Sequence, residues 1–342
     1  MVCMGKRGRS ALKRGIALLC VLLVAAVAVF AFSHRQEIRD HFAAMGFEPH
    51  PRVVEVMDEL DLTSSGERVF LATQPTIDGS QNFNEQCADV DHSEHGHVLG
   101  CFTGERIHLF DVTDERVQGV VEVTAAHELL HATYARLGEG DRAVLAPRLR
   151  AAYEELAEHD PALRERMQVY EHLSEAAFAN ELHSVLGTEV RELPDWLEEH
   201  YARWFADRGS LIDIFERYHS VFVDLQQQAD ALQAEMTTLR ADIETRKAAY
   251  DEDVRRFNED AAEFSARNER YEFSDDPGEF DRIRGELAER RDALEQTLTT
   301  LQADIDYYNG LGAQLKQLGE LSTELDRQLN SDLAPVTTRP TE

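Results

Sequence analysis

Long apolar repeats dominate the C-terminal part of the chain. In residues 211–264, and again in residues 280–329, apolar side chains recur at steps of three and four. This spacing is typical of a heptad seam, along which one helix packs against another. A turn-forming segment, SDDPG at 274–278, separates the two seams. We therefore predict an antiparallel coiled-coil hairpin over residues 211–333, with arms about 90 Å long at a rise of about 1.5 Å per residue.

Two parallel dimeric coils are the alternative to this hairpin, but the break between the seams is very short for that arrangement. Acidic faces on such helices are usually solvated surface. The functional interpretation of the helices is a spacer or docking arm for a partner protein or the cell wall. A polar, disordered tail is expected over residues 334–342.

The N-terminal end carries an apolar run without any charge. Residues 15–32 are long enough to cross a bilayer as one helix, and the basic residues of segment 1–14 precede them. The positive-inside rule then predicts a single-pass protein of the cell membrane, with a cytoplasmic N-terminus and the rest outside. A cleaved signal peptide is the alternative, and we favour the uncleaved anchor because the run exceeds a usual signal core. A short helical stalk, residues 33–50, is expected to follow.

Shorter and mixed patterns fill the segment between these ends, residues 51–210. Pro51 is expected to open an amphipathic helix. Residues 68–73, RVFLAT, and residues 106–112, RIHLFDV, are predicted to be strands, and residues 77–84 are predicted to be loop. The remainder of the segment has helical patterns. We therefore predict an α+β domain that is dominated by helices and contains a small sheet.

One helix of this domain is predicted to be buried. Its apolar residues recur at helical spacing: Val120, Val123, Ala126, Leu130 and Leu137. Thr113 or Asp114 is expected to cap its start, and Gly138 to end it.

The centre of this helix carries the sequence His127-Glu128-Leu129-Leu130-His131. Two histidines four residues apart lie on one face of a helix, so both imidazoles can bind one metal ion. Glu128 would lie beside that ion without being a ligand, where a general base for a zinc-bound water is needed. An exposed helix with a chance pair of histidines is the alternative interpretation.

A catalytic zinc ion takes three protein ligands, so a third must come from elsewhere in the chain. The best candidates lie in residues 171–186, EHLSEAAFANELHSVL. Glu181 has mostly apolar neighbours one turn away on its helix, and a carboxylate on such a face is costly unless it meets a cation. We predict Glu181 as the third ligand, with Glu175 and His183 as the alternatives.

The two motifs together, H-E-x-x-H at 127–131 and N-E-x-x-S at 180–184, resemble the signature of the gluzincin zinc metallopeptidases. The separation of His131 and Glu181, 50 residues, is longer than in thermolysin-like enzymes and nearer to that in membrane-bound peptidases of the same wider group. The resemblance implies a zincin-like catalytic domain that hydrolyses peptide bonds, with Glu128 as base and proton shuttle. It implies that Zn²⁺ binds to three side chains, namely His127, His131 and Glu181.

Polar residues near these motifs are candidates for supporting roles. Hydrogen-bond partners for the ligands are expected among Asn180, His183 and Ser184, although each also fits an ordinary helix surface. Candidate donors to the transition state are Tyr134, His183, His200 and Tyr201.

The strand predicted at 106–112 comes shortly before the motif helix. A substrate peptide could add to the free edge of this strand and pass its carbonyl over the metal. The alternative is that the strand only packs against the helix.

The chain is strongly acidic, with a formal net charge of −30 at pH 7. This excludes a nucleic-acid-binding surface over most of its length. Cys87 and Cys101 lie on the predicted outer side of the membrane, where we expect a disulfide worth about 3 kcal/mol rather than two free thiols. The intervening residues 88–100 are rich in histidine and acid, and we interpret them as a solvated loop rather than a second metal site.

Taken together, these patterns favour a membrane-anchored extracytoplasmic zinc metallopeptidase that acts on peptides or proteins. The alternative belongs to another functional class. It is a membrane-anchored coiled-coil scaffold or sensor, in which the zinc site is structural or vestigial.

Overall fold

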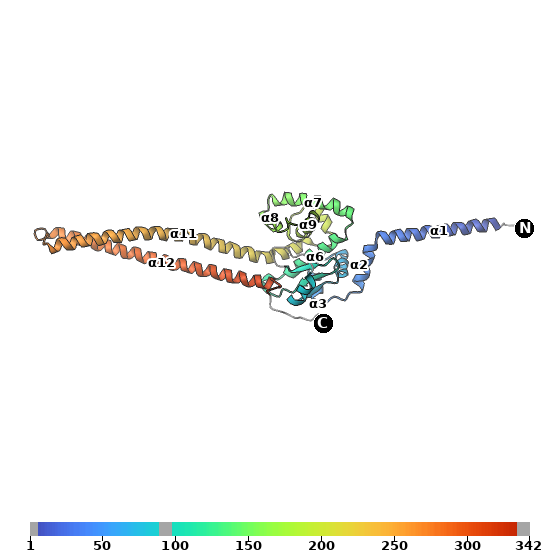
Figure 1. The fold of residues 1–342 in the computed structure, drawn as a ribbon, viewed down its shortest axis with the longest axis horizontal. Coiled ribbons are helices and arrows are strands. Elements are labelled where there is room, and N and C mark those ends of the chain that lie inside the picture. The colour runs from blue at the N-terminus through green and yellow to red at the C-terminus, as the bar shows by residue number, and fades with distance from the viewer. Residues whose placement is uncertain (1–5, 89–97, 334–342) are drawn as a thin grey trace. The chain divides into compact units, whose positions relative to one another are not determined.

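The computed structural model of this chain describes residues 6–88 and 98–333, with side chains described from residue 19 onward (Figure 1). The histidine-rich loop is therefore outside the described residues over 89–97, and so is the tail at 334–342. The chain divides into two compact units, residues 1–220 with 326–342 and residues 221–325. The predicted class, mainly helical with one small sheet, is confirmed.

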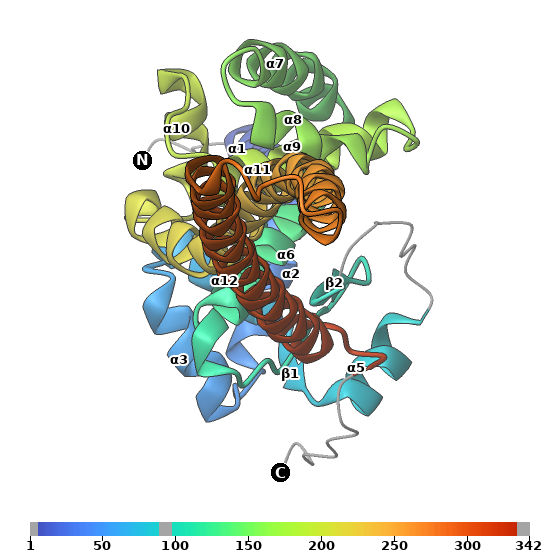
Figure 2. The same cartoon turned by 90° about the vertical axis from the view of Figure 1, so that its left-hand side faces the viewer.

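The first unit contains most of the elements. Its helices are α1 (Lys6–Ser33), α2 (Arg35–Met45), α3 (Pro51–Glu59), α4 (Ser64–Ala72), α5 (Ser80–Cys87), α6 (Val120–Arg136), α7 (Glu139–Ala157), α8 (Pro161–Gln168), α9 (Glu175–Glu189), α10 (Asp195–Tyr201) and the start of α11 (Arg208–Glu269). Its strands are β1 (Thr76–Asp78), β2 (Gly100–Phe102) and β3 (Ile107–Phe110). Helix α6 contacts α9, α3 and α4 as well as β2 and β3, so it occupies the centre of the unit (Figure 2).

The sheet has the strand order β1-β3-β2, with β1 parallel and β2 antiparallel to β3. The strand predicted at 106–112 is confirmed as β3, but the prediction of a free edge on it is wrong, because β3 is the central strand. Strand β2 pairs only with β3 among the strands that the structure describes. The segment predicted as loop at 77–84 instead supplies β1 and α5, which are too short to show a periodic pattern.

The strand predicted at 68–73 is also wrong, since this segment belongs to helix α4. Periodicity alone cannot distinguish a short apolar run in a strand from one in a helix. Thr63 begins the helix, because its hydroxyl accepts a hydrogen bond of 3.1 Å from the backbone N–H of Gly66. A Cβ on Gly66 would lie 2.3 Å from the carbonyl oxygen of Trp204, so only glycine allows this close approach.

Helix α6 begins at a glycine rather than at a side-chain cap. The predicted cap Asp114 instead accepts from the N–H of Arg116 and opens a short 3₁₀ helix, Glu115–Val117. Gly119, with φ at +101°, then turns the chain into α6. A Cβ on Gly119 would lie 2.4 Å from the side chain of Ile214, so both the backbone angle and the space require glycine.

Two ion pairs hold the ends of α6. In its first turn, the buried Glu122 accepts from Arg52 of α3 at 3.0 Å. In its last turn, Arg136 donates two hydrogen bonds of 2.9 and 3.0 Å to Asp40 of α2, which is buried. Bidentate pairing of this kind fixes orientation as well as distance. The segment predicted as a stalk therefore contains a helix that packs against α4 and pairs with α6.

The predicted disulfide between Cys87 and Cys101 is confirmed. It joins the end of α5 to the middle of β2, and both sulfurs belong to a buried apolar cluster with Phe83 and Phe110. The edge strand of the sheet is therefore covalently fixed to a helix.

The second unit consists of parts of α11 and α12 (Pro277–Leu329). In the contacts between these parts, residues further along α11 meet residues nearer the start of α12, as expected for an antiparallel pair. They are Arg246 with Asp304, Tyr307 with Glu235, and Arg290 with Asp260. The helices are connected through residues 270–276, close to the predicted break. The coiled-coil seam itself stays a prediction.

Among the described side chains, no single helix has the length and apolar character needed to span a bilayer. Leu19–Ser33 and α2 would meet that requirement only as a pair, bent by 69°. The anchor at 15–32, whose first side chains lie outside the described part, stays a prediction.

The pair between Asp40 and Arg136 generates a stability prediction. Asp40→Asn removes the charge but keeps the shape, which leaves a largely buried guanidinium without its anion. We expect the free energy of unfolding of the full chain to fall by about 2–3 kcal/mol, measured by urea denaturation. Glu37→Gln is the matched control, because Glu37 lies on the same helix with 74% of its side chain exposed. Equal stabilities of the two variants would contradict the prediction.

Candidate metal centre

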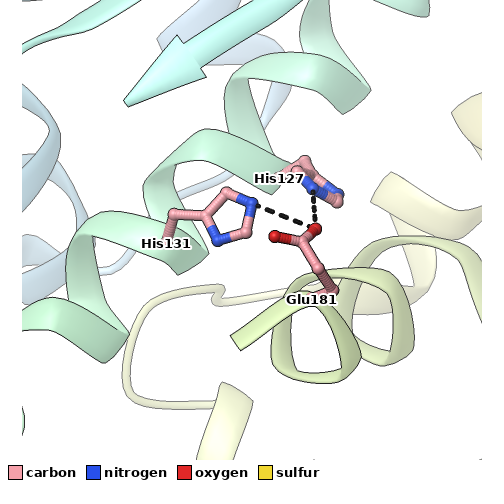
Figure 3. A group of neighbouring side chains, drawn as sticks. All are labelled: His127, His131 and Glu181. Carbon is pink, nitrogen blue, oxygen red and sulfur yellow. Dashed lines mark ion pairs between the residues drawn. The ribbon is translucent and has the colours of Figure 1, made fainter. Parts of the chain in front are cut away.

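Helices α6 and α9 cross closely and bring the two predicted motifs together. Helix α9 begins at Ser174, whose hydroxyl accepts from the N–H of Ala177. Later in α9, a Cβ on Gly187 would lie 2.3 Å from Leu130 of α6, so glycine permits the close approach of the two helices. Figure 3 shows the result: His127 and His131 extend from α6 toward Glu181 on α9.

The three side chains are separated by distances that suit a shared metal ion. Glu181 Oε2 lies 3.5 Å from His131 Nε2 and 3.7 Å from His127 Nε2 (Figure 3). One ligand atom from each residue lies within 4.8 Å of the others. Tetrahedral ligands at about 2.0–2.1 Å from a zinc ion would stand about 3.4 Å apart, whereas a direct N–H···O hydrogen bond is shorter than either measured distance. The spacing therefore fits a metal between the groups better than a direct hydrogen bond.

The surroundings of Glu181 also favour a cation. Its side chain is largely buried, and Oε2 has no hydrogen-bond donor within the described residues. A buried carboxylate oxygen without a partner is unfavourable by several kcal/mol, so such groups are normally paired or bound to a metal. This group of two imidazoles and one carboxylate could hold a metal ion, and it is one of the donor sets found in catalytic zinc sites.

Without a metal, the pKa values of the three side chains are shifted in different directions. Burial alone would lower the pKa of His127, but the carboxylates of Glu181 and Glu128 outweigh burial and raise it to about 9. Burial lowers the pKa of His131, and the neighbouring His127 adds to that effect. The pKa of Glu181 is lowered, because the two imidazoles outweigh the effect of its burial. The metal-free centre therefore favours a proton on His127.

The structure distinguishes between the candidates for the third ligand. Glu181 lies with the two histidines, as predicted. Glu175 is exposed in the first turn of α9. His183 is fully buried and packs against Tyr134, Tyr201 and Trp204 rather than joining the group.

Glu128 is buried beneath the edge strand β2. A Cβ on Gly100 would lie 2.9 Å from Cγ and 3.1 Å from Oε1 of Glu128, and 2.6 Å from Thr124 Cγ2. The backbone of β2 therefore lies directly against the Glu128 side chain. Sequence reasoning missed Gly100: a glycine in a strand can mark a close approach of another group, but it does not identify that group as Glu128.

The predicted supporting residues lie near the centre. Asn180 precedes Glu181 on α9 and lines the same pocket as His131. Asn180 Oδ1, His131 Nδ1 and Ser184 Oγ are buried without hydrogen-bond partners in the described parts of the chain. Asn180 and Ser184 are thus available to orient ligands, whereas the ring nitrogen Nε2 of His183 meets Nε2 of His200 at 2.8 Å.

The four candidate donors to the transition state make different contacts in the structure. The hydroxyl of Tyr201 donates to the backbone carbonyl of His183 at 2.7 Å, which commits it to structure. His183 and His200 contact each other. Tyr134, one helical turn beyond His131, lines a pocket beside the centre.

Metal binding itself can be tested with a pair of glutamates on α9. We expect the full chain to bind one equivalent of Zn²⁺, measured by elemental analysis and chelator competition. Glu181→Gln should weaken binding by more than about tenfold, since even outer hydrogen-bond partners of metal ligands contribute that much. Glu175→Gln, a change of the same kind at an exposed site, should leave binding unchanged. Equal affinities of both variants would remove Glu181 from the site.

The pKa of His127 gives a second prediction. Below about 9 the metal-free imidazole carries a proton, and binding of a metal requires the neutral ring. Zinc must therefore displace this proton, so the apparent Kd should fall about tenfold per pH unit as the pH rises from 6.5 to 8.5. Competition with a zinc dye of known pH dependence measures this slope. A Kd independent of pH over this range would contradict the protonation assigned to His127.

Comparisons with known proteins add no family to this description. No protein-family model, curated protein or solved structure matches the chain. A functional assignment therefore depends on the chemistry of the centre.

Proposed function

We propose that the chain is a zinc-dependent metallopeptidase of the gluzincin type. The observation that carries this proposal is the convergence of His127, His131 and Glu181 in one largely buried group, with Glu128 next to His127 on the same helix. Two histidines and a carboxylate are a donor set of catalytic zinc sites, which keep a further coordination position for water. The proposal assigns zinc as the metal because of this donor set.

Each residue of the group has a distinct task in this proposal. Bound zinc supplies Lewis acidity, which lowers the pKa of water and polarises a peptide carbonyl. The two imidazoles and Glu181 hold the ion. Glu128 accepts the proton of the attacking water and returns it to the nitrogen of the leaving amine. Its burial beneath β2 restricts the movement of the carboxylate.

Strand β2 is the proposed guide for the substrate. It pairs with β3 on one side, and no other described strand covers its second side. An extended peptide that adds to this edge would make backbone hydrogen bonds with β2 and lie above Glu128, because Gly100 lies directly against that side chain. The disulfide at Cys101 holds the edge in position.

The surroundings of the enzyme are also part of the proposal. Residues 15–32 act as a membrane anchor, and the catalytic unit lies outside the cytoplasm, where the disulfide between Cys87 and Cys101 persists. The paired helices of the second unit form a coiled-coil arm that contacts a partner protein or the cell wall. The net charge of −30 disfavours nucleic acid as a substrate or partner.

Glu128→Gln tests the catalytic role without disturbing the ligands. Hydrolysis of unfolded casein by the zinc-loaded full chain in detergent should fall by about 10²–10⁴-fold, which is the usual contribution of a general base. The zinc content should stay at that of the parent protein. Glu171→Gln, a change of the same kind at an exposed residue that neither joins the metal group nor lines the adjoining pocket, is the control that should keep both zinc and activity. Zinc binding without hydrolysis in the parent would instead support the scaffold with a structural metal site.

A further inference from the structure

A pocket of about 640 Å³ lies next to the metal centre. It is lined by α6, α7, α9 and the last residue of β2. His131 and Asn180 border it on the side of the metal centre, and half of the remaining lining residues are alanines. Small side chains leave room for part of a substrate, so the chemistry of the pocket depends on its few polar groups.

Arg142 of α7 is the one arginine or lysine among the described residues that line this pocket. It is half-buried, and it makes no ion pair with the side chains described in residues 19–88 and 98–333. Four other buried or half-buried arginines of the unit each meet a carboxylate, and the half-buried Arg68 meets only a serine hydroxyl. The four pairs are Arg52 with Glu122, Arg136 with Asp40, Arg166 with Glu189, and Arg208 with Glu198. Arg142 is therefore a guanidinium that has lost part of its hydration without gaining an anion.

Tyr134 lines the same pocket as Arg142. Burial raises the pKa of the Tyr134 phenol, and the charge of Arg142 acts in the opposite direction. The pocket thus offers two kinds of donor, the guanidinium N–H groups and a phenol O–H. This combination suits a carboxylate, which accepts bidentate hydrogen bonds from arginine.

Two carboxylates, Glu139 and Glu175, also line the pocket and would attract cations. Both are exposed, so water screens their charges. Arg142 is less accessible to water, and a ligand that pairs with it gains more than one that pairs with the exposed acids. The polar groups therefore favour an anionic ligand in the interior of the pocket.

The register of β2 relates the pocket to the bond that is cleaved. Gly100 lies against Glu128, and Phe102, two residues further along the strand, lines the pocket. Two residues of an extended chain span about 6.8 Å. A peptide along β2 with its carbonyl at the metal would thus bring a group one or two residues away to the pocket.

We propose that this pocket binds a carboxylate of the substrate through Arg142 and Tyr134, so that the enzyme selects peptides with a carboxylate close to the cleaved bond. The carboxylate can be an acidic side chain or the C-terminus of the peptide. This inference rests on the proposed peptidase function, from which it takes the position of the substrate.

Binding to the zinc-loaded Glu128→Gln chain tests the inference without turnover. One set of short alanine-serine peptides, blocked at both ends, carries a single glutamate or glutamine at each position in turn. The second set is one pair of peptides without any acidic side chain, one with a free and one with an amidated C-terminus. In one of the two sets, we expect the peptide with the carboxylate to bind about tenfold more tightly than the matching neutral peptide. The set that shows this preference identifies the source of the carboxylate.

Substitutions at Arg142 then assign the preference to this residue. Adding Arg142→Ala to Glu128→Gln should abolish it, and adding Arg142→Glu should reverse it toward lysine-containing peptides, with the zinc content unchanged. Arg148→Ala, on the same helix but outside the pocket, should keep the preference. A carboxylate preference that survives Arg142→Ala, or no preference in either set, would overturn the inference.

Hydrolysis by the parent chain separates this inference from the proposed function. Cleavage of neutral and acidic peptides at equal rates would refute the carboxylate pocket and leave the peptidase intact. An Arg142-dependent binding preference without any cleavage would refute the peptidase and leave the pocket as a carboxylate-binding site.

Discussion

The carboxylate of Glu181 is the constraint on which the rest of the first unit depends. Moving a carboxylate into a protein interior costs several kcal/mol unless a cation or hydrogen-bond donors replace water. Without a metal, a protonated His127 compensates for only part of this cost, because its Nε2 lies 3.7 Å from Oε2, beyond an ordinary hydrogen bond, and Oε2 has no donor among the described residues. A divalent ion between the three groups would remove this cost, so binding of a metal here would also stabilise the structure of this region.

The position of that carboxylate follows from backbone packing around α6. Gly187 lets α9 approach α6, Gly100 lets β2 lie on Glu128, and Gly119 turns the chain into the helix. Ion pairs hold both ends of α6, and the disulfide holds β2. The centre is therefore surrounded by elements that are fixed by separate interactions, as the proposed catalysis would require for precise placement of its groups.

The features that the sequence predicts correctly are those that depend on the properties of neighbouring residues in the chain. The motif helix and the preference for Glu181 over Glu175 follow from periodicity and from the cost of a carboxylate on an apolar face, and the disulfide follows from the topology. Helix α4 and strand β1 were predicted incorrectly, because runs of this length carry no reliable period. The place of β3 in the centre of the sheet, and the contact of Gly100 with Glu128, depend on residues that are distant in the chain and could not be predicted from one sequence.

The paired long helices α11 and α12 differ from a free terminal segment, because both of their outer ends are attached to the first unit. Ile214 and Phe215 of α11 are buried in the first unit, and beyond α12 the side chain of Asn84 donates to Ser331 O at 3.2 Å and Asp332 Oδ1 at 3.0 Å. Residues 221–325 thus leave one unit and return to it between two attached ends. A free tail can be shortened at any residue, whereas this segment can change length only by matched deletions or insertions on both helices. Homologous chains should therefore vary here in paired steps that preserve the facing register.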